Sequence, residues 1–248
     1  MKSVIVTRQI IRHINLLSDL PDTLVDILVH SSSVRNIKRG GSLFSQGDTA
    51  KTVYAVISGQ CRLLQHTLDG QDVTMSIFTT GDLIGVVAVI GDEEYPGTCQ
   101  TVDDAVILAI PATSIQDLMQ SHAAFGVKMV HLLVQRIHDA HDHIRELTSE
   151  RVERRLARTI LRLTKKIGVK SESGIRLNMP LSRQDLAEMC GTTLYTVSRI
   201  LSEWQRDGLV EIGRESVSIQ KPHNLVLIAE DLNGVDLGPP SESSESPT

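Results

Sequence analysis

The polar side chains best suited to specific hydrogen bonding gather in residues 180–206, PLSRQDLAEMCGTTLYTVSRILSEWQR. Five of them recur every three or four positions and so share one face of a helix: Tyr195, Ser198, Arg199, Ser202 and Arg206. A guanidinium group donates two parallel hydrogen bonds to guanine O6 and N7, or to a phosphate. This face is therefore equipped to bind DNA rather than to break a bond.

The neighbouring residues indicate two helices joined by a tight turn. Ser182 and Asp185 have the spacing of a capping box, so a first helix begins there, and Gly191 ends it. A second helix begins at Thr192 or Thr193. Its apolar residues fall at helical spacing on the face opposite the polar one: Val197, Ile200, Leu201 and Trp204. The segment LVEIGRESVSI that follows is typical of two short strands that form a β-wing.

We interpret this pattern as a winged helix-turn-helix whose second helix enters the major groove of DNA. An ordinary αα-hairpin with a solvated polar face is the alternative. The residues expected to contact bases or phosphates are Ser182, Arg183, Gln184, Thr192, Thr193, Tyr195, Thr196, Ser198, Arg199 and Ser202.

The distribution of charge supports this interpretation. The 248 residues have a net charge of −5, which is unusual for a DNA-binding protein until the charge is divided along the chain. Residues 1–149 carry 11 Lys and Arg against 16 Asp and Glu, residues 150–221 carry 14 against 9, and residues 222–248 carry none against 5. The positive charge lies with the helix-turn-helix, as expected for a DNA-binding domain joined to a domain with another task.

The composition, with 41% hydrophobic and 22% charged residues, is that of a globular protein large enough for two domains. No apolar stretch approaches the roughly 20 residues of a membrane span, and the N-terminus lacks the features of a signal peptide. We therefore expect a cytoplasmic protein without a membrane partner. The cysteines at positions 61, 99 and 190 lie too far apart for a CxxC metal site, and we expect buried free thiols.

The N-terminal half has the pattern of a small helical lead-in followed by many short strands. Between Val34 and Ile110, apolar runs such as YAVI, CRLL and VTMSIF alternate with the turn sequences GG, QGD, SG and TGD. The predicted fold class is α+β: an N-terminal jelly-roll-like β-roll over residues 1–121, a long dimerisation helix and hinge over 122–148, and a winged helix-turn-helix domain over 149–222. Residues 223–248 begin with a last short helix and form a tail that we expect to be largely disordered.

The long helix carries a heptad seam, in which apolar residues are spaced alternately by three and four. The seam residues are Val127, Val130, Val134, Ile137, His141 and Ile144. They predict a parallel two-helix contact in a dimer, and the alternative is a helix that packs on its own β-roll. His138 and His141 have a spacing that could hold a metal ion, but we interpret them as solvated or seam histidines and predict no metal site.

The segment Glu146–Glu150 interrupts the apolar pattern, and we place the hinge there. Ser149 is expected to cap the next helix, whose apolar side includes Leu156 and Ile160. The basic side of that helix carries five arginines that we expect mostly in solvent: Arg151, Arg154, Arg155, Arg158 and Arg162.

Over residues 12–225 the chain resembles the CRP/FNR family of bacterial transcription regulators. The segments GGSLFSQGD, VYAVISGQCRLL and TTGDLIG are similar to the β-roll of cyclic-nucleotide-binding domains. ERRLARTILRL and PLSRQDLAEMCGTTLYTVSRIL are similar to the family's C-terminal domain. The resemblance implies a homodimer, a small-molecule effector pocket in each β-roll, and two recognition helices in successive major grooves of a pseudo-palindromic operator. It also implies RNA polymerase as a partner.

The positions that bind cyclic AMP in family members differ in this chain. The family's Glu for the ribose and its Arg-Ser pair for the cyclic phosphate match Val86, Pro96 and Gly97, which cannot supply those charge-assisted hydrogen bonds. The expected effector pocket comprises Gly85, Val86, Pro96, Gly97 and Thr98. We predict an unidentified effector other than cyclic AMP in the usual mode.

The sequence does not identify a cofactor. No cysteine precedes Cys61, so we expect no iron–sulfur cluster of the kind held by N-terminal cysteines in one branch of the family. His66 or a histidine of the long helix is a candidate haem ligand, which keeps a haem-based gas sensor as an alternative. A regulator that needs no effector and is controlled by its abundance is another alternative.

The recognition helix also departs from the family pattern. Many members have a Glu where this chain has Tyr195, and Tyr195 cannot accept a hydrogen bond from cytosine as a carboxylate does. It could instead contact a phosphate or a thymine methyl group, while Arg199 can still bind guanine. The operator is expected to keep a guanine and otherwise to differ from the family consensus.

Two other functional classes are disfavoured. The sequence has no nucleophile elbow, P-loop, HExxH or paired-carboxylate motif, so we predict that the protein is not an enzyme. A purely architectural DNA-binding protein would leave the β-roll without a task.

Overall fold

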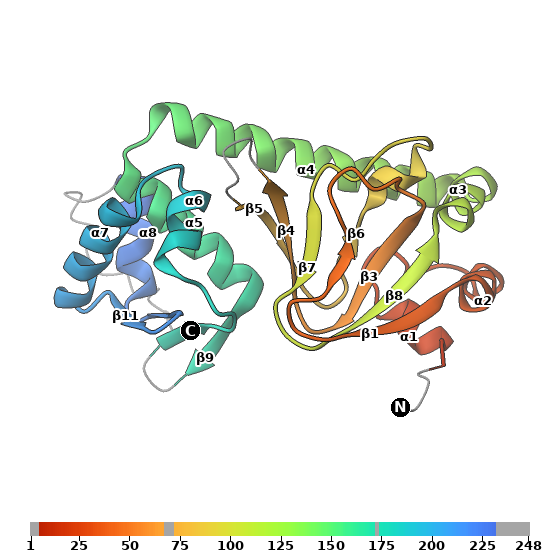
Figure 1. Cartoon of the computed structure of the whole chain (residues 1–248), viewed down its shortest axis with the longest axis horizontal. Coiled ribbons are helices and arrows are strands. Elements are labelled where there is room, and N and C mark those ends of the chain that lie inside the picture. The colour runs from red at the N-terminus through yellow and green to blue at the C-terminus, as the bar shows by residue number, and fades with distance from the viewer. Residues whose placement is uncertain (1–4, 67–71, 172–173, 232–248) are drawn as a thin grey trace, which may run out of the picture.

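The computed structural model describes residues 5–66, 72–171 and 174–231. An N-terminal β-roll with its helices and a smaller C-terminal unit lie side by side, and the long helix α4 (Ala123–Ser149) runs along both (Figure 1). This arrangement confirms the α+β class and the order of β-roll, long helix and helix-turn-helix. Within the described residues, no helix is both long and apolar enough to cross a bilayer.

The β-roll consists of two four-stranded antiparallel sheets. One has the order β1 (Ser33–Ile37), β8 (Ala105–Pro111), β3 (Thr52–Ser58) and β6 (Leu83–Ile84). The other has the order β2 (Ser42–Phe44), β7 (Thr98–Thr101), β4 (Cys61–His66) and β5 (Asp72–Phe78). Consecutive residues of β3 and β8 are buried, with Val53 and Ile107 completely so, which means that both faces of these strands are covered and explains the continuous apolar runs in the sequence.

Short helices close the open end and the side of the β-roll. They are α1 (Arg8–Arg12), α2 (Asp22–Ser31), the 3₁₀ helix η1 (Val86–Val89) and α3 (Ala112–Ser121). The turn between β3 and β4 depends on Gly59, whose φ is +86° and whose added Cβ would lie 2.8 Å from Ala105. No other residue type combines that backbone conformation with that close approach.

Helix α4 has two apolar faces. Phe125 and Met129 are buried in the core of the β-roll, and Arg136 donates a hydrogen bond of 2.7 Å to the carbonyl of Leu83. On another face, the apolar seam residues Val127, Val130, Val134, Ile137 and Ile144 are 41–58% exposed, and His141 is exposed as well. The helix thus packs on its own β-roll through Phe125 and Met129 and leaves the seam partly exposed, and the dimer contact stays a prediction.

The C-terminal unit is folded around a second hydrophobic core. Its elements are α5 (Val152–Ile167), β9 (Gly168–Ser171), β10 (Gly174–Leu177), α6 (Arg183–Met189), α7 (Leu194–Arg206), β11 (Val210–Gly213), β12 (Ser216–Ile219) and α8 (Pro222–Glu230). The four strands form one sheet in the order β11-β12-β10-β9. Leu225 and Ala229 of α8 are buried against α5, so the short helix is part of this core although the sequence placed it at the start of the tail. The expected disorder of the last dozen residues lies outside the described residues.

The prediction that Ser149 caps α5 was wrong. Ser149 is the last residue of α4, and its Oγ donates to the carbonyl of Arg145 at 2.7 Å. The chain breaks at Glu150, which is extended, and α5 begins after Arg151 without a side-chain cap. Helix α4 continues through residues 146–149. Its Glu146 is buried, and Arg162 of α5 binds the carboxylate.

Three of the five arginines, Arg154, Arg155 and Arg158, are partly buried and bound within the protein, whereas Arg151 and Arg162 are exposed. Glu146 is 3% exposed, and its carboxylate accepts hydrogen bonds of 2.6 and 2.7 Å from Nη1 of Arg162. Arg158 lies 3.4 Å from the carboxylate of Glu150. Arg155 donates to the carbonyls of Glu150 and Cys190, at 2.9 Å each. The sequence prediction failed here because the two glutamates come from the end of α4, which only the fold brings alongside α5.

The two units also touch directly. Gln60 Nε2 at the start of β4 donates to the carbonyl of Asn178 at 2.8 Å, and Lys166 lies 3.2 Å from Asp82. Ile77 of β5 is buried in the C-terminal core, next to α6. The position of the helix-turn-helix thus depends on contacts with the β-roll as well as on α4.

Candidate nucleic-acid interface and effector region

The first helix of the pair, α6, begins with the predicted capping box. Ser182 Oγ accepts from the amide of Asp185 at 3.0 Å, and the Asp185 carboxylate accepts from the amide of Ser182 at 2.8 Å. Asp185 also lies 3.7 Å from Arg62 of β4. The Ser182 hydroxyl is therefore occupied with starting the helix, whereas Arg183 and Gln184 after it are exposed.

The turn has the geometry that the sequence predicted. Gly191 has a φ of +58°, and a Cβ there would lie 2.6 Å from Cδ2 of Leu147 at the end of α4. Thr193 is the N-cap of α7, since its Oγ1 accepts from the amide of Thr196 at 3.2 Å. The left-handed backbone is the reason that favours glycine here, because the Leu147 side chain could shift to make room for a Cβ.

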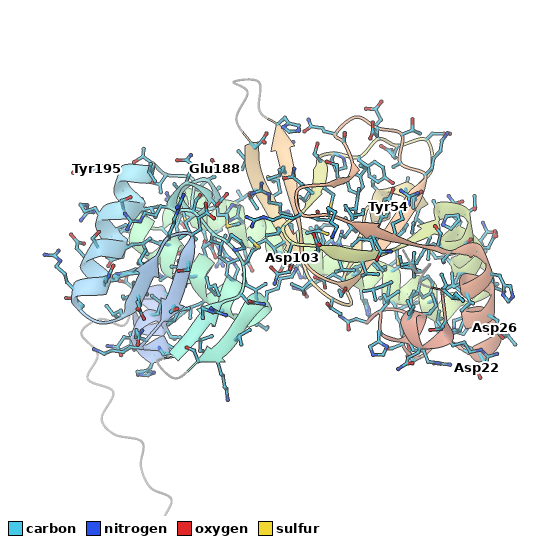
Figure 2. The ribbon with its side chains drawn as sticks, turned by 60° about the horizontal axis from the view of Figure 1, so that its bottom comes forward. Asp22, Asp26, Tyr54, Asp103, Glu188 and Tyr195 are labelled. Carbon is cyan, nitrogen blue, oxygen red and sulfur yellow. The ribbon has the colours of Figure 1, made fainter. Side chains whose placement is uncertain are left out.

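Helix α7 is divided into a buried and an exposed face, as the spacing predicted. Val197, Ile200, Leu201 and Trp204 are buried. Tyr195, Arg199 and Ser202 are exposed, and Figure 2 shows Tyr195 at the outer surface of the C-terminal unit. Arg199 Nη1 binds the carboxylate of Glu203 at 2.9 Å in the absence of DNA. The guanidinium is thus oriented along the exposed face, where an operator would compete with Glu203 for it.

All ten predicted DNA contacts lie on α6, the turn and α7. Six of them are exposed, namely Arg183, Gln184, Thr193, Tyr195, Arg199 and Ser202, and four are partly buried, namely Ser182, Thr192, Thr196 and Ser198. The exposed set offers two guanidinium groups and several hydroxyls on one side of the unit.

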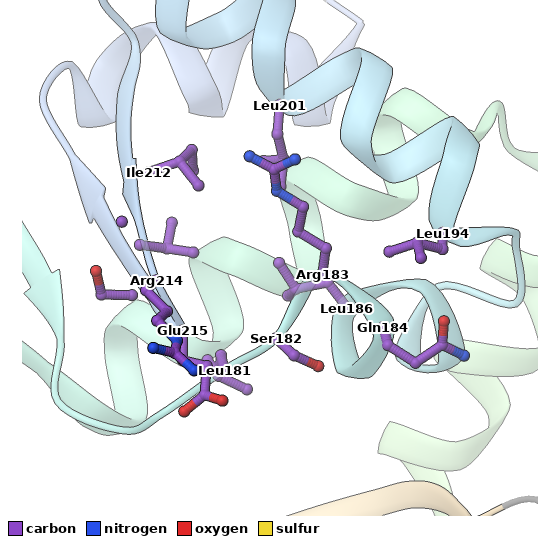
Figure 3. Close-up of a pocket in the computed structure, with 13 residues that line it drawn as sticks. Leu181, Ser182, Arg183, Gln184, Leu186, Leu194, Leu201, Ile212, Arg214 and Glu215 are labelled. Carbon is purple, nitrogen blue, oxygen red and sulfur yellow. The ribbon is translucent and has the colours of Figure 1, made fainter.

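A hollow of about 470 Å³ separates α6 and α7 from the wing. Its walls are mainly apolar, with Leu186, Leu201 and Ile212 among them, and Arg183 extends across it toward Leu201 in Figure 3. Leu194 at the start of α7 and Arg214 at the tip of the wing also line it. Neither residue was among the predicted DNA contacts.

In the β-roll, aromatic rings occupy the region next to the predicted effector pocket. The ring of Tyr95 stacks on that of Phe44 with centroids 3.8 Å apart, and the Tyr95 hydroxyl donates to the carbonyl of Thr52 at 2.6 Å. Burial raises the pKa of Tyr95 to about 12, so the hydroxyl stays a neutral donor. A Cβ on Gly85 would lie 2.9 Å from the Tyr95 ring. Tyr95 was not among the predicted pocket residues, although it directly precedes Pro96.

The remaining pocket positions offer no charged group to a phosphate. Val86 and Gly97 are buried, and a Cβ on Gly97 would lie 2.6 Å from the carbonyl of Leu64. Thr98 Oγ1 accepts from the amide of Gln46 at 3.0 Å and is bonded to His66 Nε2 at 3.0 Å. A cyclic phosphate placed here would meet no guanidinium from these residues.

The predicted haem ligand His66 is already engaged on both ring nitrogens. Nδ1 binds Asp72 and Nε2 binds Thr98, so a haem iron would have to replace one of these bonds. The thiols of Cys61, Cys99 and Cys190 are free and buried, and the contact with Cys61 together with burial raises the pKa of Cys99. In the part of the chain that the structure covers, no three His, Cys, Asp or Glu side chains gather in a group that could hold a metal ion.

Comparison with known protein families gives two matches that follow the two units. Residues 34–122 match the cyclic nucleotide-binding domain, and residues 154–228 match the Crp-like helix-turn-helix domain. The fumarate and nitrate reduction regulatory protein of Escherichia coli K12 is 27% identical over 193 residues, which are 78% of this chain and 77% of that protein. The chain belongs to the CRP/FNR family of bacterial transcription regulators.

Superposition on solved structures of the same fold includes most of this chain and nearly all of each related chain. FixK2 from Bradyrhizobium japonicum superposes with a TM-score of 0.69 at 18% identity, over 79% of this chain and 96% of that one. The c-di-GMP responsive global regulator CLP from Xanthomonas campestris superposes with a TM-score of 0.67 at 23% identity, over 80% and 99%. At such identities the superpositions establish the CRP/FNR fold and nothing about the ligand.

Proposed function

We propose that this CRP/FNR-family chain works as a homodimer that binds a pseudo-palindromic operator and is controlled by a small molecule other than cyclic AMP in its usual mode. The observation that carries the proposal is the exposed polar face of α7, which holds Arg199 and Tyr195 clear of the core on a capped helix. The basic charge of residues 150–221 supports the same role. A regulator of this kind acts on the chromosome, in the cytoplasm, together with RNA polymerase.

Within this proposal, the ten residues on α6, the turn and α7 have two kinds of task. Arg199 contacts a guanine edge, and the residues at the helix starts, such as Arg183 and Thr193, contact phosphates. Phosphate contacts set the register of the helix, whereas base contacts select the sequence. The domain limits that we propose are those of the sequence analysis, with α8 added to the DNA-binding domain because its apolar residues complete that core.

Arg199→Ala is expected to weaken binding to the operator by about 1–3 kcal/mol and to change binding to random DNA much less. The reason is that only the operator places a guanine, with its O6 and N7 acceptors, in register with the guanidinium of Arg199. Fluorescence anisotropy with both duplexes measures the difference. Arg199→Lys is the matched control, because it keeps the charge and loses the fork geometry, so it should resemble Ala on the operator. An equal loss on both duplexes would identify Arg199 as a phosphate contact.

Cyclic AMP is expected not to bind in the micromolar range. The acid for the ribose and the guanidinium for the phosphate are replaced by Val86 and Pro96, and the stacked ring of Tyr95 borders Gly85. Isothermal titration of the dimer with cyclic AMP checks this, and a micromolar dissociation constant would contradict it. A control titration of a cyclic-AMP-binding family member shows that the assay detects such binding.

The effector itself is best sought on protein purified from its own host. An ultraviolet-visible spectrum with a Soret band would favour the haem-sensor alternative, and His66 would then have to leave Asp72 or Thr98. A native mass spectrum with additional bound mass would identify another ligand class. A dimer mass alone would favour a weak, exchangeable effector or a regulator controlled by abundance.

A further inference from the structure

Two large apolar side chains stand next to each other in the first turn of α7. Leu194 is 47% exposed and Tyr195 is 78% exposed, the largest fraction of any large apolar side chain in the described residues. The other apolar residues of α7 are buried in the core. A pair of large, exposed apolar side chains on a helix whose other apolar residues are buried indicates a binding surface rather than a packing requirement.

Neither residue is needed to form the helix. Thr193 supplies the N-cap, and Val197, Ile200, Leu201 and Trp204 supply the buried stripe. Leu194 lies at the edge of the hollow between α6, α7 and the wing, on the same side as Arg183 and Gln184 (Figure 3). The apolar pair is thus placed among the residues that we propose to contact DNA.

The first turn of α7 contains no acidic residue. It therefore has no carboxylate acceptor for the cytosine amino group, which an acidic residue at the position of Tyr195 would provide. Tyr195 and Arg199 are separated by one helical turn, about 6 Å of rise, which corresponds to roughly two base-pair steps of 3.4 Å. A base contacted by the apolar pair would accordingly lie within a few base pairs of the guanine contacted by Arg199.

Thymine is the base that presents an apolar group, its 5-methyl group, in the major groove. We propose that Leu194 and the ring of Tyr195 bind thymine methyl groups and so determine a thymine in each half-site close to the guanine bound by Arg199. This rests on the proposed function. It assigns a specificity role to Leu194, and it selects the thymine contact for Tyr195 over the phosphate contact that the phenol hydroxyl could make.

The test begins with selection of duplexes from a random-sequence library by the full-length protein. Each thymine of the enriched half-site is then replaced singly by deoxyuridine, which lacks only the methyl group. We expect a three- to fivefold loss of affinity, roughly the transfer free energy of one methyl group, at a thymine within a few base pairs of the guanine and no loss at thymines outside the half-site. If no deoxyuridine replacement changes the affinity, the inference is wrong while the proposed function stands. If no sequence is enriched, the proposed function itself fails.

Substitutions of Leu194 and Tyr195 test whether these two residues contact the thymine methyl group. Leu194→Ala and Tyr195→Ala should each reduce the preference for thymine over deoxyuridine, because the apolar surface that meets the methyl group is removed. Tyr195→Phe is the matched control and should keep the preference, because it retains the ring. If Tyr195→Phe instead weakened thymine and deoxyuridine duplexes equally, Tyr195 would be a phosphate contact and its part of the inference would be wrong. Both side chains are exposed, and circular dichroism confirms that each variant is folded.

Discussion

Ile137→Asp is expected to convert the protein to a monomer and to lower its affinity for a palindromic operator by roughly two orders of magnitude. Ile137 is at the centre of the α4 seam and is 53% exposed in the single chain. In a parallel dimer the two aspartates would face each other in an apolar contact, where the cost of removing charge from water is high. A monomer would bind each half-site independently and would lose the gain from linking two recognition helices.

Analytical ultracentrifugation measures the first effect and gel-shift titration the second. Gln135→Glu is the matched control, because Gln135 is exposed on α4 but lies outside the seam, so this added charge should leave the dimer intact. A dimer of unchanged stability in the Ile137→Asp protein would contradict the seam as the interface. A footprint that covers a single half-site, instead of two whose centres are about 34–36 Å apart, would contradict the dimer on DNA.

Trp204→Ala is expected to destabilise the C-terminal unit by about 3–5 kcal/mol and to abolish DNA binding. Trp204 is 2% exposed, and its Nε1 donates to the carboxylate of Glu153 on α5 at 3.1 Å. Alanine removes the ring that packs α7 on the second core and leaves a cavity that the short helices cannot fill. The recognition helix would then lose its fixed orientation, although every residue of its exposed face remains.

Urea denaturation followed by circular dichroism measures the stability of the variant. Trp204→Phe keeps most of the packing and loses the hydrogen bond, so its loss should be clearly smaller than that of alanine. Tyr195→Ala on the same helix removes an exposed ring and should leave the denaturation midpoint nearly unchanged. A loss below about 1 kcal/mol for Trp204→Ala would show that α7 is not held by this core.

The junction between α4 and α5 suggests how the β-roll and the recognition helix are coupled. Arg155 of α5 donates to the carbonyl of Glu150 at the break and to the carbonyls of Cys190 and Gly191 in the turn before α7. Leu147 of α4 lies against Gly191 as well. A shift of α4 relative to the β-roll would therefore act on the turn directly, which is the route we propose for a population shift between two positions of α7.

Much of the helix-turn-helix could be predicted from the sequence because its signals are local. The Ser182 and Asp185 capping box, the left-handed Gly191 and the Thr193 cap each depend on residues within a few positions. The buried and exposed faces of α7 also follow from spacing, since 3.6 residues per turn assign each position a side. The β-roll could be predicted because its short apolar runs and turn sequences are also local signals.

Other features depend on residues distant in the sequence, and only the tertiary structure decided them. Glu146 is buried and paired with Arg162 and Arg158 of α5, and α4 includes Ser149, which was expected to cap α5. The stacking of Tyr95 on Phe44 joins residues about 50 positions apart and fills space beside Gly85. The sequence by itself determined the helix starts, the turn and the buried and exposed faces of α7, since periodicity and caps are local. The tertiary structure decided which charges are bound internally and which side chains border the predicted effector-pocket positions, because burial and pairing depend on the whole fold.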